Sequence, residues 1–473
     1  MPSTALLWFR RDLRLTDHPA LHRAVTEFER VVPVFVLDDL LLDGRYRSGP
    51  RASFMLGCLE ALDEELRRRG SALVVRHGRP ERELPLLAGQ VGADAVLWTS
   101  DVSPYAGARD GRVTEALRAA GVRAQQSGGA YVIDPSRPRT SAGEPYSIFS
   151  RFFRVWRDVE RRALHPAPDA LAPLPDGLEP GRVLGGDELG LEPQVPDPIR
   201  EPGERAGRAA LDAWLADGLA HYHERQEGMA RIGTSRLSPY LRWGCLSPRE
   251  CEQRAREVAT GGSGSWVRQL AWRDFYAHTL LLHPANVRAE QQERFRALER
   301  DDDSERVAAW AEARTGFPLV DAGMRQLRTR GWMHNRVRLV TGSFLTKELH
   351  GDWRAGEDVF ARFLFDGEPA QNNGNWQWIA SVGTDPAPYF RRMYNPALHQ
   401  GRFDPHGEYV RRYLPELAGV PDAKLAEPWT MTAAEQRAAG CVIGRDYPAP
   451  IVDRKVERER VMGRYRRVTA DQA

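Results

Sequence analysis

The run VVPVFVL, residues 31–37, is apolar at every position and rich in β-branched valine. Three more short runs of apolar or β-branched residues lie nearby: ALLWF (5–9), SALVVRHG (71–78) and ADAVLW (93–98). Runs of this length and composition suit strands that are buried on both faces of a parallel sheet. They predict a parallel β-sheet at the start of the chain.

Helix-like segments separate these runs. SFMLGCLEALDEELRRRG (53–70) ends in basic residues followed by glycine, which is typical of a helix C-terminus. Strands that alternate with helices predict a doubly wound α/β domain, which we place at residues 1–135. This region contains neither GxGxxG nor GxxxxGK[ST], so the sequence does not support dinucleotide or P-loop binding.

We expect residues 136–204 to form an interdomain linker, since 165–204 are rich in Pro, Gly and acidic residues. From there on the periodicity is helical, which predicts an all-α domain over 205–473. Ser238 and Ser247, each followed by proline, are expected N-caps. Gly331, Gly351 and Gly367 are expected just past helix C-termini.

The bulk composition indicates a soluble protein of two or three domains. The chain has 473 residues, 42% of them hydrophobic and 28% charged. It shows no signal peptide and no apolar span of about 18 residues, so we expect a cytoplasmic protein. Its four cysteines form no CxxC pair, which predicts free thiols and no metal site.

A net charge of +2 predicts no general affinity for nucleic acid. Between Arg325 and Arg354, however, seven Lys or Arg residues stand against two acidic ones. Such a segment, with aromatic residues interleaved, is typical of a nucleic-acid-binding face. A solvated helix face would explain the charge equally well.

Four other stretches carry unusual combinations of residues. DGEPAQNNGNWQW (366–378) joins turn-forming Asn and Gly to two tryptophans, so it is either a turn that buries aromatic anchors or the wall of a site. IGTSRLSPYL (232–241) gathers three hydroxyls and an arginine, which suits a diphosphate. WVRQLAWRDFYAH (266–278) aligns Trp266, Gln269 and Arg273 on one helical stripe, although two core tryptophans would explain it too.

The fourth stretch, GWMHNRVRL (331–339), places Asn335 and Arg338 on one helix face and directs Arg336 elsewhere. A buried Arg338 needs an acidic partner, for which Asp366 is the candidate. His334 is expected to be a helix-surface or a hydrogen-bonded histidine rather than a ligand, and no partner spacing suggests a metal.

Several motifs occur together in one order: WFRRDLRLTDHPAL, TSRLSPYL, RQLAWRDF, TGFPLVDAGMRQL, GWMHNRVR, DWRAGEDVF, NNGNWQW and YNPALHQGRFDP. With them the chain resembles the photolyase–cryptochrome family over essentially its whole length, and is most similar to microbial class I cyclobutane pyrimidine dimer photolyases. The resemblance implies an α/β antenna domain and a helical domain that holds reduced, anionic FAD.

The resemblance also implies which residues contact FAD. They are Tyr222, Thr234, Ser235, Arg236, Leu237, Ser238, Trp266, Gln269, Arg273, Trp332, Asn335, Arg338, Asp366, Gly367, Glu368 and Asn372. Asp366 would pair with Arg338, and Asn372 would face the flavin N5. A nearby arginine stabilises the flavin's negative charge, and an amide can donate or accept at N5.

The implied activity is a carbon–carbon lyase reaction on UV-damaged DNA. Photolyases act on a dimer that is flipped out of the duplex, so base flipping is inferred for this chain from the resemblance alone. Asn372, Trp376, Trp353 and Gln269 would serve catalysis and electron transfer. Trp272, Trp378, Arg336, Leu339 and Arg391 would contact the damaged strand.

Three positions depart from the family pattern. Arg300 stands where the third tryptophan of the photoreduction chain usually lies, which concerns photoreduction rather than repair. Gln269 replaces a common glutamate, and Leu339 a common methionine. PYAGARD (104–110) is shorter than the loop of folate-binding members, so the antenna chromophore stays open among a folate, a deazaflavin and FMN.

The alternative function is a cryptochrome-like blue-light photosensor without repair activity. Such photosensors usually carry a long C-terminal tail, for which the sequence after IVDRKVERERVMGRYRRV (451–468) leaves no room. Asn372 also favours repair. We expect a monomer that has no obligate protein partner and no membrane association.

Overall fold

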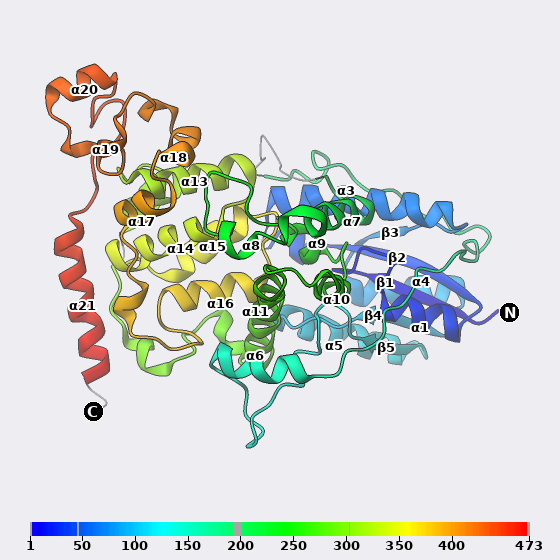
Figure 1. The fold of residues 1–473 in the computed structure, drawn as a ribbon. Helices are drawn as coiled ribbons and strands as arrows, with labels where there is room; N and C mark the ends of the chain where they lie inside the picture. Colours follow the sequence, from blue (N-terminus) through cyan, green and yellow to red (C-terminus); the bar gives the residue numbers. More distant parts are fainter. Residues whose placement is uncertain (1, 45–46, 193–200, 302, 471–473) are drawn as a thin grey trace.

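The structure is a computed structural model that describes residues 2–44, 47–192, 201–301 and 303–470. Five strands of the described chain form one parallel sheet with the order β3-β2-β1-β4-β5 (Figure 1). They are β1 (Thr4–Phe9), β2 (Arg30–Asp38), β3 (Val74–Gly78), β4 (Ala95–Thr99) and β5 (Arg123–Ser127). The doubly wound α/β domain predicted from the sequence is therefore confirmed. The sequence did not predict β5, because its residues RAQQS lack an apolar run.

Helices cover both faces of this sheet. Leu7 and Phe9 of β1 point into a core with α1 (Pro19–Glu27) and α3 (Gly49–Arg68). Leu6 and Trp8 point the other way, into a core with α4 (Pro80–Val91) and α5 (Pro104–Ala119). The short α2 (Asp39–Leu42) follows β2. Because both faces are buried, the three central strands β2, β1 and β4 are apolar at nearly every position.

The second part of the chain is helical, as predicted. Its helices are α7 (Glu204–Ala213), α8 (Tyr222–Arg225), α9 (Ser238–Trp243), α10 (Pro248–Val258), α11 (Ser263–Leu282), α12 (Ser304–Ala311), α13 (Pro318–Arg330), α14 (Asn335–Ser343), α15 (Trp353–Phe363), α16 (Pro369–Ile379), α17 (Pro396–Phe403), α18 (Glu408–Tyr413), α19 (Asp422–Leu425), α20 (Ala433–Ala439) and α21 (Arg454–Ala470). One-turn π-helices continue α7 (Trp214–Gly218) and α14 (Phe344–Glu348). Short 3-10 turns lie at Pro284–Val287, Glu293–Ala297, Tyr389–Arg392, Pro415–Leu417 and Pro428–Thr430.

The expected linker contains a helix of its own, α6 (Phe149–Asp158), which packs against α11. Its buried residues Phe152 and Trp156 join the main core. Residues 193–200 of the expected linker lie outside the described residues. The domain division at residues 135 and 204 stays a prediction.

The predicted helix ends are partly right. Ser247 caps α10, and Gly331 follows α13 in the left-handed conformation, as expected. Ser238 is not an N-cap: it is the first residue of α9, and its hydroxyl is used elsewhere. Gly351 is not a helix C-cap either, since His350 takes the left-handed conformation (φ 53°) in its place.

The expectation for Gly367 is also wrong, because α15 ends four residues earlier, at Phe363. Leu364 turns to extended backbone, and the Phe365 N–H donates to the Gly331 carbonyl oxygen at the end of α13. A tertiary hydrogen bond thus ends this helix without a glycine.

The stretch 366–378 is not a turn, since Pro369–Ile379 form α16. Pro369 starts the helix, as its fixed φ favours. A Cβ on Gly374 would lie 2.2 Å from the Tyr276 ring of α11, so glycine permits this close helix packing. The Asn373 amide donates to the Asn286 carbonyl oxygen at 2.9 Å. Tertiary contacts therefore outweigh the low helix propensity of Asn and Gly.

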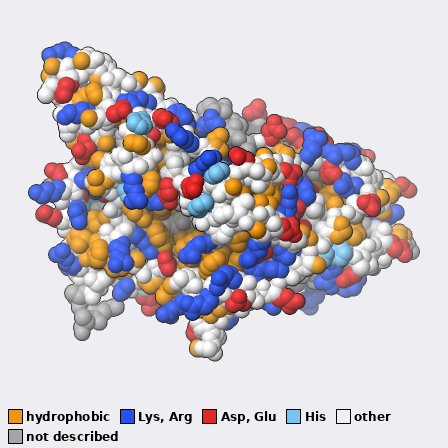
Figure 2. Space-filling view, viewed as in Figure 1, with side chains coloured by type: hydrophobic (Ala, Val, Ile, Leu, Met, Phe, Trp, Pro, Cys, Tyr) orange, Lys and Arg blue, Asp and Glu red, His pale blue; other side chains and the backbone are white. Residues whose placement is uncertain are grey.

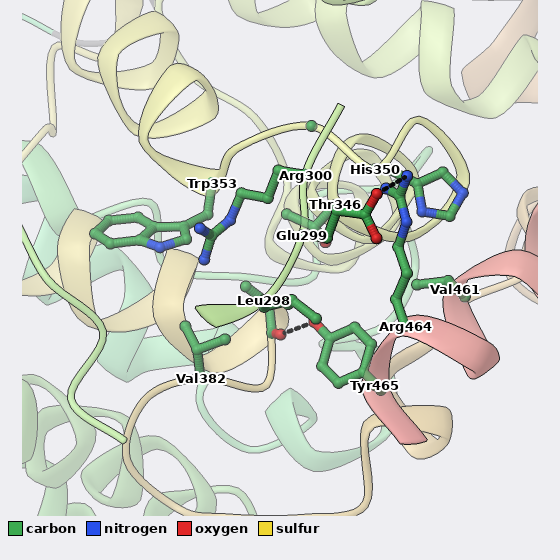
Figure 3. A pocket seen from close by; sticks show the side chains of 12 residues that line it. Leu298, Glu299, Arg300, Thr346, His350, Trp353, Val382, Val461, Arg464 and Tyr465 are labelled. Carbon is green, nitrogen blue, oxygen red and sulfur yellow. Dashed lines mark hydrogen bonds and ion pairs between the residues drawn. The ribbon is translucent and has the colours of Figure 1, made fainter. Parts of the chain in front are cut away.

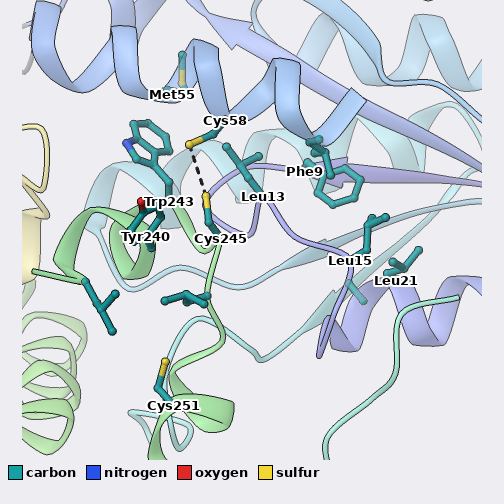
Figure 4. Close-up of a cluster of buried hydrophobic side chains, with 14 of the residues drawn as sticks. Phe9, Leu13, Leu15, Leu21, Met55, Cys58, Tyr240, Trp243, Cys245 and Cys251 are labelled. Carbon is teal, nitrogen blue, oxygen red and sulfur yellow. Dashed lines mark hydrogen bonds between the residues drawn. The ribbon is translucent and has the colours of Figure 1, made fainter. Parts of the chain in front are cut away.

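One hydrophobic core runs from the sheet into the helical part. Figure 4 shows Met55 and Cys58 of α3 facing Trp243 and Cys245, which lie at and just after the end of α9. The Cys58 and Cys245 Sγ atoms are 3.5 Å apart. The four cysteines are free, as the sequence predicted, and all four are buried. In the described part of the chain, no helix combines the length and apolar character needed to cross a membrane.

Candidate functional site

A buried carboxylate joins three segments at the centre of the helical part. Arg338 Nη2 donates to Asp366 Oδ2 at 2.9 Å, and the Ser238 hydroxyl donates to the same oxygen at 2.7 Å. Arg338 Nε also donates to the Met333 carbonyl oxygen at 2.8 Å, which holds the guanidinium in place. The ion pair between Asp366 and Arg338 that the sequence predicted is confirmed.

The hydroxyl-rich loop 234–238 lies between two tryptophans of the predicted cofactor set. Trp266 Nε1 of α11 donates to Ser235 Oγ at 3.3 Å. Arg236 adopts a left-handed backbone (φ 51°), and its guanidinium lies 5.1 Å from the Trp332 ring centroid. The structure therefore brings this loop together with α11 and with the residues that precede α14.

The other members of the cofactor set differ in exposure. Tyr222 and Leu237 are buried, Thr234 is half-buried and Asn335 is exposed. His334 caps α14, with its Nδ1 accepting from the Arg336 N–H at 3.2 Å. Burial lowers the pKa of His334 to about 4, so its ring is neutral at pH 7. It is thus the hydrogen-bonded histidine that the sequence predicted.

Glu368 and Arg273 have structural partners that the sequence did not reveal. The Glu368 carboxylate lies 2.6 Å from Arg11 Nη2 and 3.5 Å from Arg273 Nε, and it accepts from the Tyr131 hydroxyl at 2.8 Å. Burial alone would raise the pKa of Glu368, but Arg273 and Arg11 outweigh it and lower the pKa to about 2. These side chains join the sheet domain to the helices, a role that differs from the flavin contact expected for them.

Helix α16 presents its residues to two different surroundings. The Asn372 amide donates to the Glu357 carbonyl oxygen at 2.9 Å, which fixes its orientation on α15. Trp376 is 3% exposed and packs against α15, where a Cβ on Gly356 would lie 2.1 Å from its ring. Trp378 is half-buried, two residues further along. Residues two positions apart point about 200° apart on a helix, so the two indoles face opposite ways.

Trp378 and Trp272 are connected through Asp385 and Phe149. Asp385 Oδ2 accepts from Trp378 Nε1 at 3.3 Å, and Asp385 Oδ1 accepts from the Phe149 N–H at 3.4 Å. The Phe149 ring in turn stacks on Trp272 with centroids 3.6 Å apart and an interplanar angle of 8°. Asp385 therefore links Trp378 to the aromatic stack that contains Trp272.

Phe149 and the arginines of α6 were missed by the sequence reasoning, because they lie in the expected linker. Arg151, Arg154 and Arg157 are exposed on α6. The Arg268 guanidinium of α11 lies 5.0 Å from the Phe149 ring centroid. Figure 2 shows Lys and Arg side chains gathered where α6 lies. We call Arg151, Arg154, Arg157 and Arg268 the α6 arginine strip.

The basic segment 325–354 does not form one charged face. Arg325 pairs with Glu416, Arg354 with Glu290, and Lys347 is fully buried. Arg336, expected at the DNA strand, donates through Nε to Glu227 at 2.6 Å. Most of these basic side chains therefore have acidic partners within the fold or are buried, and whether the segment contacts nucleic acid stays a prediction.

The remaining predicted substrate residues are accessible to different degrees. Gln269 and Arg391 are exposed, and Leu339 is half-buried. The neighbouring Arg392, which the sequence did not single out, lies 3.8 Å over the Trp378 ring and donates to the Trp378 carbonyl oxygen. Arg392 therefore positions Trp378.

A second candidate site is a cavity of about 440 Å³ between the sheet and the helices. It lies at the carboxyl ends of β1 and β2, next to the point where the strand order reverses between β1 and β4, a common place for ligands. Arg242 Nη1 and Trp243 Nε1 are buried in its wall and find no hydrogen-bond partner among the residues that the structure describes. The cavity therefore offers two donors to a ligand with acceptor atoms.

This architecture defines a two-domain protein with a helical cofactor site and an adjoining basic, aromatic surface. The family model for the FAD binding domain of DNA photolyase matches residues 266–467, and the model for DNA photolyase matches residues 5–173. The chain belongs to the DNA photolyase family and carries its FAD-binding domain.

Relatives and solved structures agree with this assignment. The chain is 38% identical to the deoxyribodipyrimidine photo-lyase of Halobacterium salinarum, over 99% of this chain and 100% of that protein. A class III photolyase from Agrobacterium tumefaciens superposes with a TM-score of 0.92 at 34% identity, covering 99% and 98% of the two chains. A cryptochrome from Synechocystis superposes with a TM-score of 0.91 at 30% identity, covering 98% and 99%.

Replacing Glu368 should destabilise the protein in a pH-dependent way. Because its folded pKa of about 2 lies below the ordinary 4.5, its contribution is present above about pH 4.5 and is lost as the pH falls toward 2. We expect Glu368→Gln to lower the free energy of unfolding by about 3 kcal/mol at pH 7, since the buried Arg273 loses its carboxylate partner while Arg11 keeps Asp101.

Denaturant midpoints of the wild type and the variant across this pH range test the prediction. The difference should shrink steadily below pH 4.5. The control Glu188→Gln removes an exposed partner of Arg182, so it should leave the midpoint nearly unchanged. A Glu368→Gln midpoint equal to that of the control at pH 7 would contradict the role of this ion pair.

Proposed function

We propose that the protein is a light-driven lyase that repairs cyclobutane pyrimidine dimers in DNA. The observation that carries the proposal is the pair of tryptophans on opposite faces of α16. Trp376 is buried toward α15, while Trp378 is partly exposed beside the stack of Trp272 on Phe149. One helix thus separates an electron-transfer side from a base-stacking side.

The residues present fit FAD as the cofactor. Thr234, Ser235 and Arg236 supply hydroxyl and guanidinium groups for the phosphates and the ribityl chain, while the Ser238 hydroxyl donates to Asp366 and so supports the Arg338 ion pair. Arg338, already held by Asp366, supplies a positive charge beside an anionic ring. The Asn372 amide nitrogen donates to the Glu357 carbonyl oxygen of α15, and this fixed side chain would lie beside the flavin N5. Bound FAD supplies the photoexcited electron that splits the dimer, and it recovers that electron afterwards.

A flipped dimer would stack on Trp378 and Trp272, as bases stack on aromatic side chains in sequence-tolerant sites. Gln269 is exposed on α11, one turn before Trp272, and offers an amide to the thymine carbonyl and N–H groups. Leu339 adds apolar contact. The α6 arginine strip and Arg391 would contact phosphates, which position the strand without reading its sequence.

A photosensor without repair is the second candidate, and the similarity to the Synechocystis cryptochrome favours it. Such a protein needs the flavin site but has no need of an aromatic platform beside a row of exposed arginines. The Trp378, Asp385 and Phe149 linkage therefore favours repair over signalling.

Repair is tested with purified FAD-containing protein, irradiated DNA and blue light, which should restore intact pyrimidines. Trp378→Ala should weaken binding of dimer-containing DNA by about 1–3 kcal/mol, roughly 5- to 150-fold in Kd, because one stacking surface is removed. Trp376→Phe should bind DNA normally but photoreduce FAD poorly. FAD-loaded wild type that leaves dimers intact would refute the proposed function, and exchanged phenotypes would refute the assignment of the two tryptophans.

The α6 arginine strip should contribute by neutralising phosphates. We expect replacement of Arg151, Arg154 and Arg157 by alanine to weaken binding of damaged and undamaged DNA alike. The salt dependence of log K should become shallower by about 0.9 for each phosphate that the variant no longer neutralises. Arg67→Ala with Arg68→Ala, two exposed arginines on α3, is the control and should change neither quantity. An unchanged salt slope in the triple variant would exclude the strip from the DNA interface.

We further propose that the 440 Å³ cavity holds a light-harvesting chromophore with a flat tricyclic ring, a deazaflavin or FMN, rather than a folate. Its buried donors on Arg242 and Trp243 suit ring carbonyl oxygens, and PYAGARD forms the first turns of α5 at its edge. Protein mixed with each chromophore should gain that chromophore's absorption band after gel filtration. Retention of the folate alone would overturn the proposal.

A further inference from the structure

The chain leaves α16 at Ala380 and turns toward the start of α6. Tyr465 Oη and Lys347 Nζ both donate to the Ala380 carbonyl oxygen, at 2.5 and 2.9 Å. Val382 is fully buried, and it lines the small cavity of Figure 3 together with Tyr465. The base of this segment is therefore held in the helical core, and Asp385 is the residue through which the segment reaches α6.

Asp385 is fixed by its backbone before its side chain makes any contact. Its N–H donates to the carbonyl oxygen of Ser147, two residues before the first residue of α6, at 2.6 Å. Its own carbonyl oxygen accepts from Arg392 Nη2. Its backbone is left-handed (φ 53°), a conformation that Asp and Asn adopt more readily than most residues with a side chain. The fold therefore sets where the carboxylate lies.

The two carboxylate oxygens of Asp385 serve two different aromatic walls. Oδ2 accepts from Trp378 Nε1 at 3.3 Å, and Oδ1 accepts from the Phe149 N–H at 3.4 Å. Phe149 in turn stacks on Trp272, with ring centroids 3.6 Å apart. Both hydrogen bonds are long, as those of a site often are before its ligand binds. One side chain thus governs the spacing between Trp378 and the stack of Trp272 on Phe149.

A carboxylate suits this place better than a neutral side chain. The donors on Trp378 and Phe149 require two acceptor oxygens, which a carboxylate has and an amide lacks, because half of an amide group is itself a donor. The negative charge of Asp385, whose side chain is 30% exposed, would repel phosphates. The Arg392 guanidinium offsets that charge, since it lies 3.8 Å from the carboxylate and 3.8 Å over the Trp378 ring.

We propose that Asp385 is the positioning residue that sets the spacing of Trp378 and Trp272 and thereby makes the protein prefer dimer-containing DNA to undamaged DNA. The proposal rests on the proposed function, in which a flipped dimer stacks on these two tryptophans. A dimer is a rigid pair of rings, whereas an undamaged pyrimidine is a single flat ring. Two walls held at a fixed spacing can therefore discriminate between them.

The test uses Asp385→Asn, which keeps the size of the side chain and its tolerance of the left-handed backbone. Its amide can satisfy only one of the two donors. We expect the Kd for dimer-containing DNA to rise about tenfold, because one buried N–H loses its acceptor. Binding of undamaged DNA should change by less than about twofold, because the phosphate contacts of the α6 arginine strip do not involve Asp385.

The matched control is Asp176→Asn, which removes the same charge from an exposed aspartate in the expected linker. It should leave both affinities unchanged. Fluorescence anisotropy with labelled duplexes, with and without one dimer, measures the ratio of the two Kd values. A ratio in Asp385→Asn equal to that of wild type would overturn the proposal.

A double-mutant cycle tests whether Asp385 acts through Trp378. Trp378→Phe keeps an aromatic ring for stacking but has no N–H to donate. Because the two substitutions break the same hydrogen bond, the loss of affinity for dimer-containing DNA in the double variant should be smaller than the product of the two single losses. A loss equal to that product would show that the two residues act independently and would contradict the assignment.

Two measurements separate positioning from a structural role. The FAD content and the thermal unfolding midpoint of Asp385→Asn should match those of wild type, whereas a structural defect would lower the midpoint and weaken binding of both DNAs alike. In protein labelled with 5-fluorotryptophan, the fluorine resonance of Trp378 should shift in Asp385→Asn and that of Trp376 should not. An unmoved Trp378 resonance would overturn the proposal.

The failure of this inference and the failure of the proposed function have different signatures. Wild-type protein that prefers dimer-containing DNA but leaves dimers intact under blue light would refute repair. The role of Asp385 in binding would then stand if Asp385→Asn lost that preference. Wild-type protein that repairs dimers, with an Asp385→Asn variant that keeps the full preference, would overturn the inference about Asp385 alone.

Discussion

The buried ion pair of Glu368 with Arg11 and Arg273 is the interaction on which the arrangement of the site depends. It joins the sheet domain to α11 and lies at the first turn of α16. Bringing these charges out of water is costly, and removing one of them leaves the others uncompensated. The network therefore ties the direction of α16 to the packing of the two domains, so Asn372, Trp376 and Trp378 project from a helix whose start is held by both.

The geometry of α16 directs Trp376 and Trp378 to different surroundings. Trp376 and Trp378 are two residues apart, so their side chains diverge by about 200° and cannot serve the same ligand. Gly356 and Gly374 let α16 approach α15 and α11 closely, which buries Trp376 while the Arg392 guanidinium covers one face of Trp378. Under the proposed function, this single short helix would separate the cofactor side from the DNA side.

The sheet and the ion pair of Arg338 with Asp366 could be predicted from the sequence, because short local motifs indicate them. Apolar runs indicated the sheet, and a buried arginine in a polar motif pointed to Asp366. The helical state of α16 could not be predicted, because Asn and Gly disfavour helices and the compensating contacts come from Tyr276 and Asn286, about 90 residues away. Phe149 was missed because it lies in the expected linker, and the partners of Glu368, Arg11 and Arg273, are remote in sequence. Long-range contacts have no local signature.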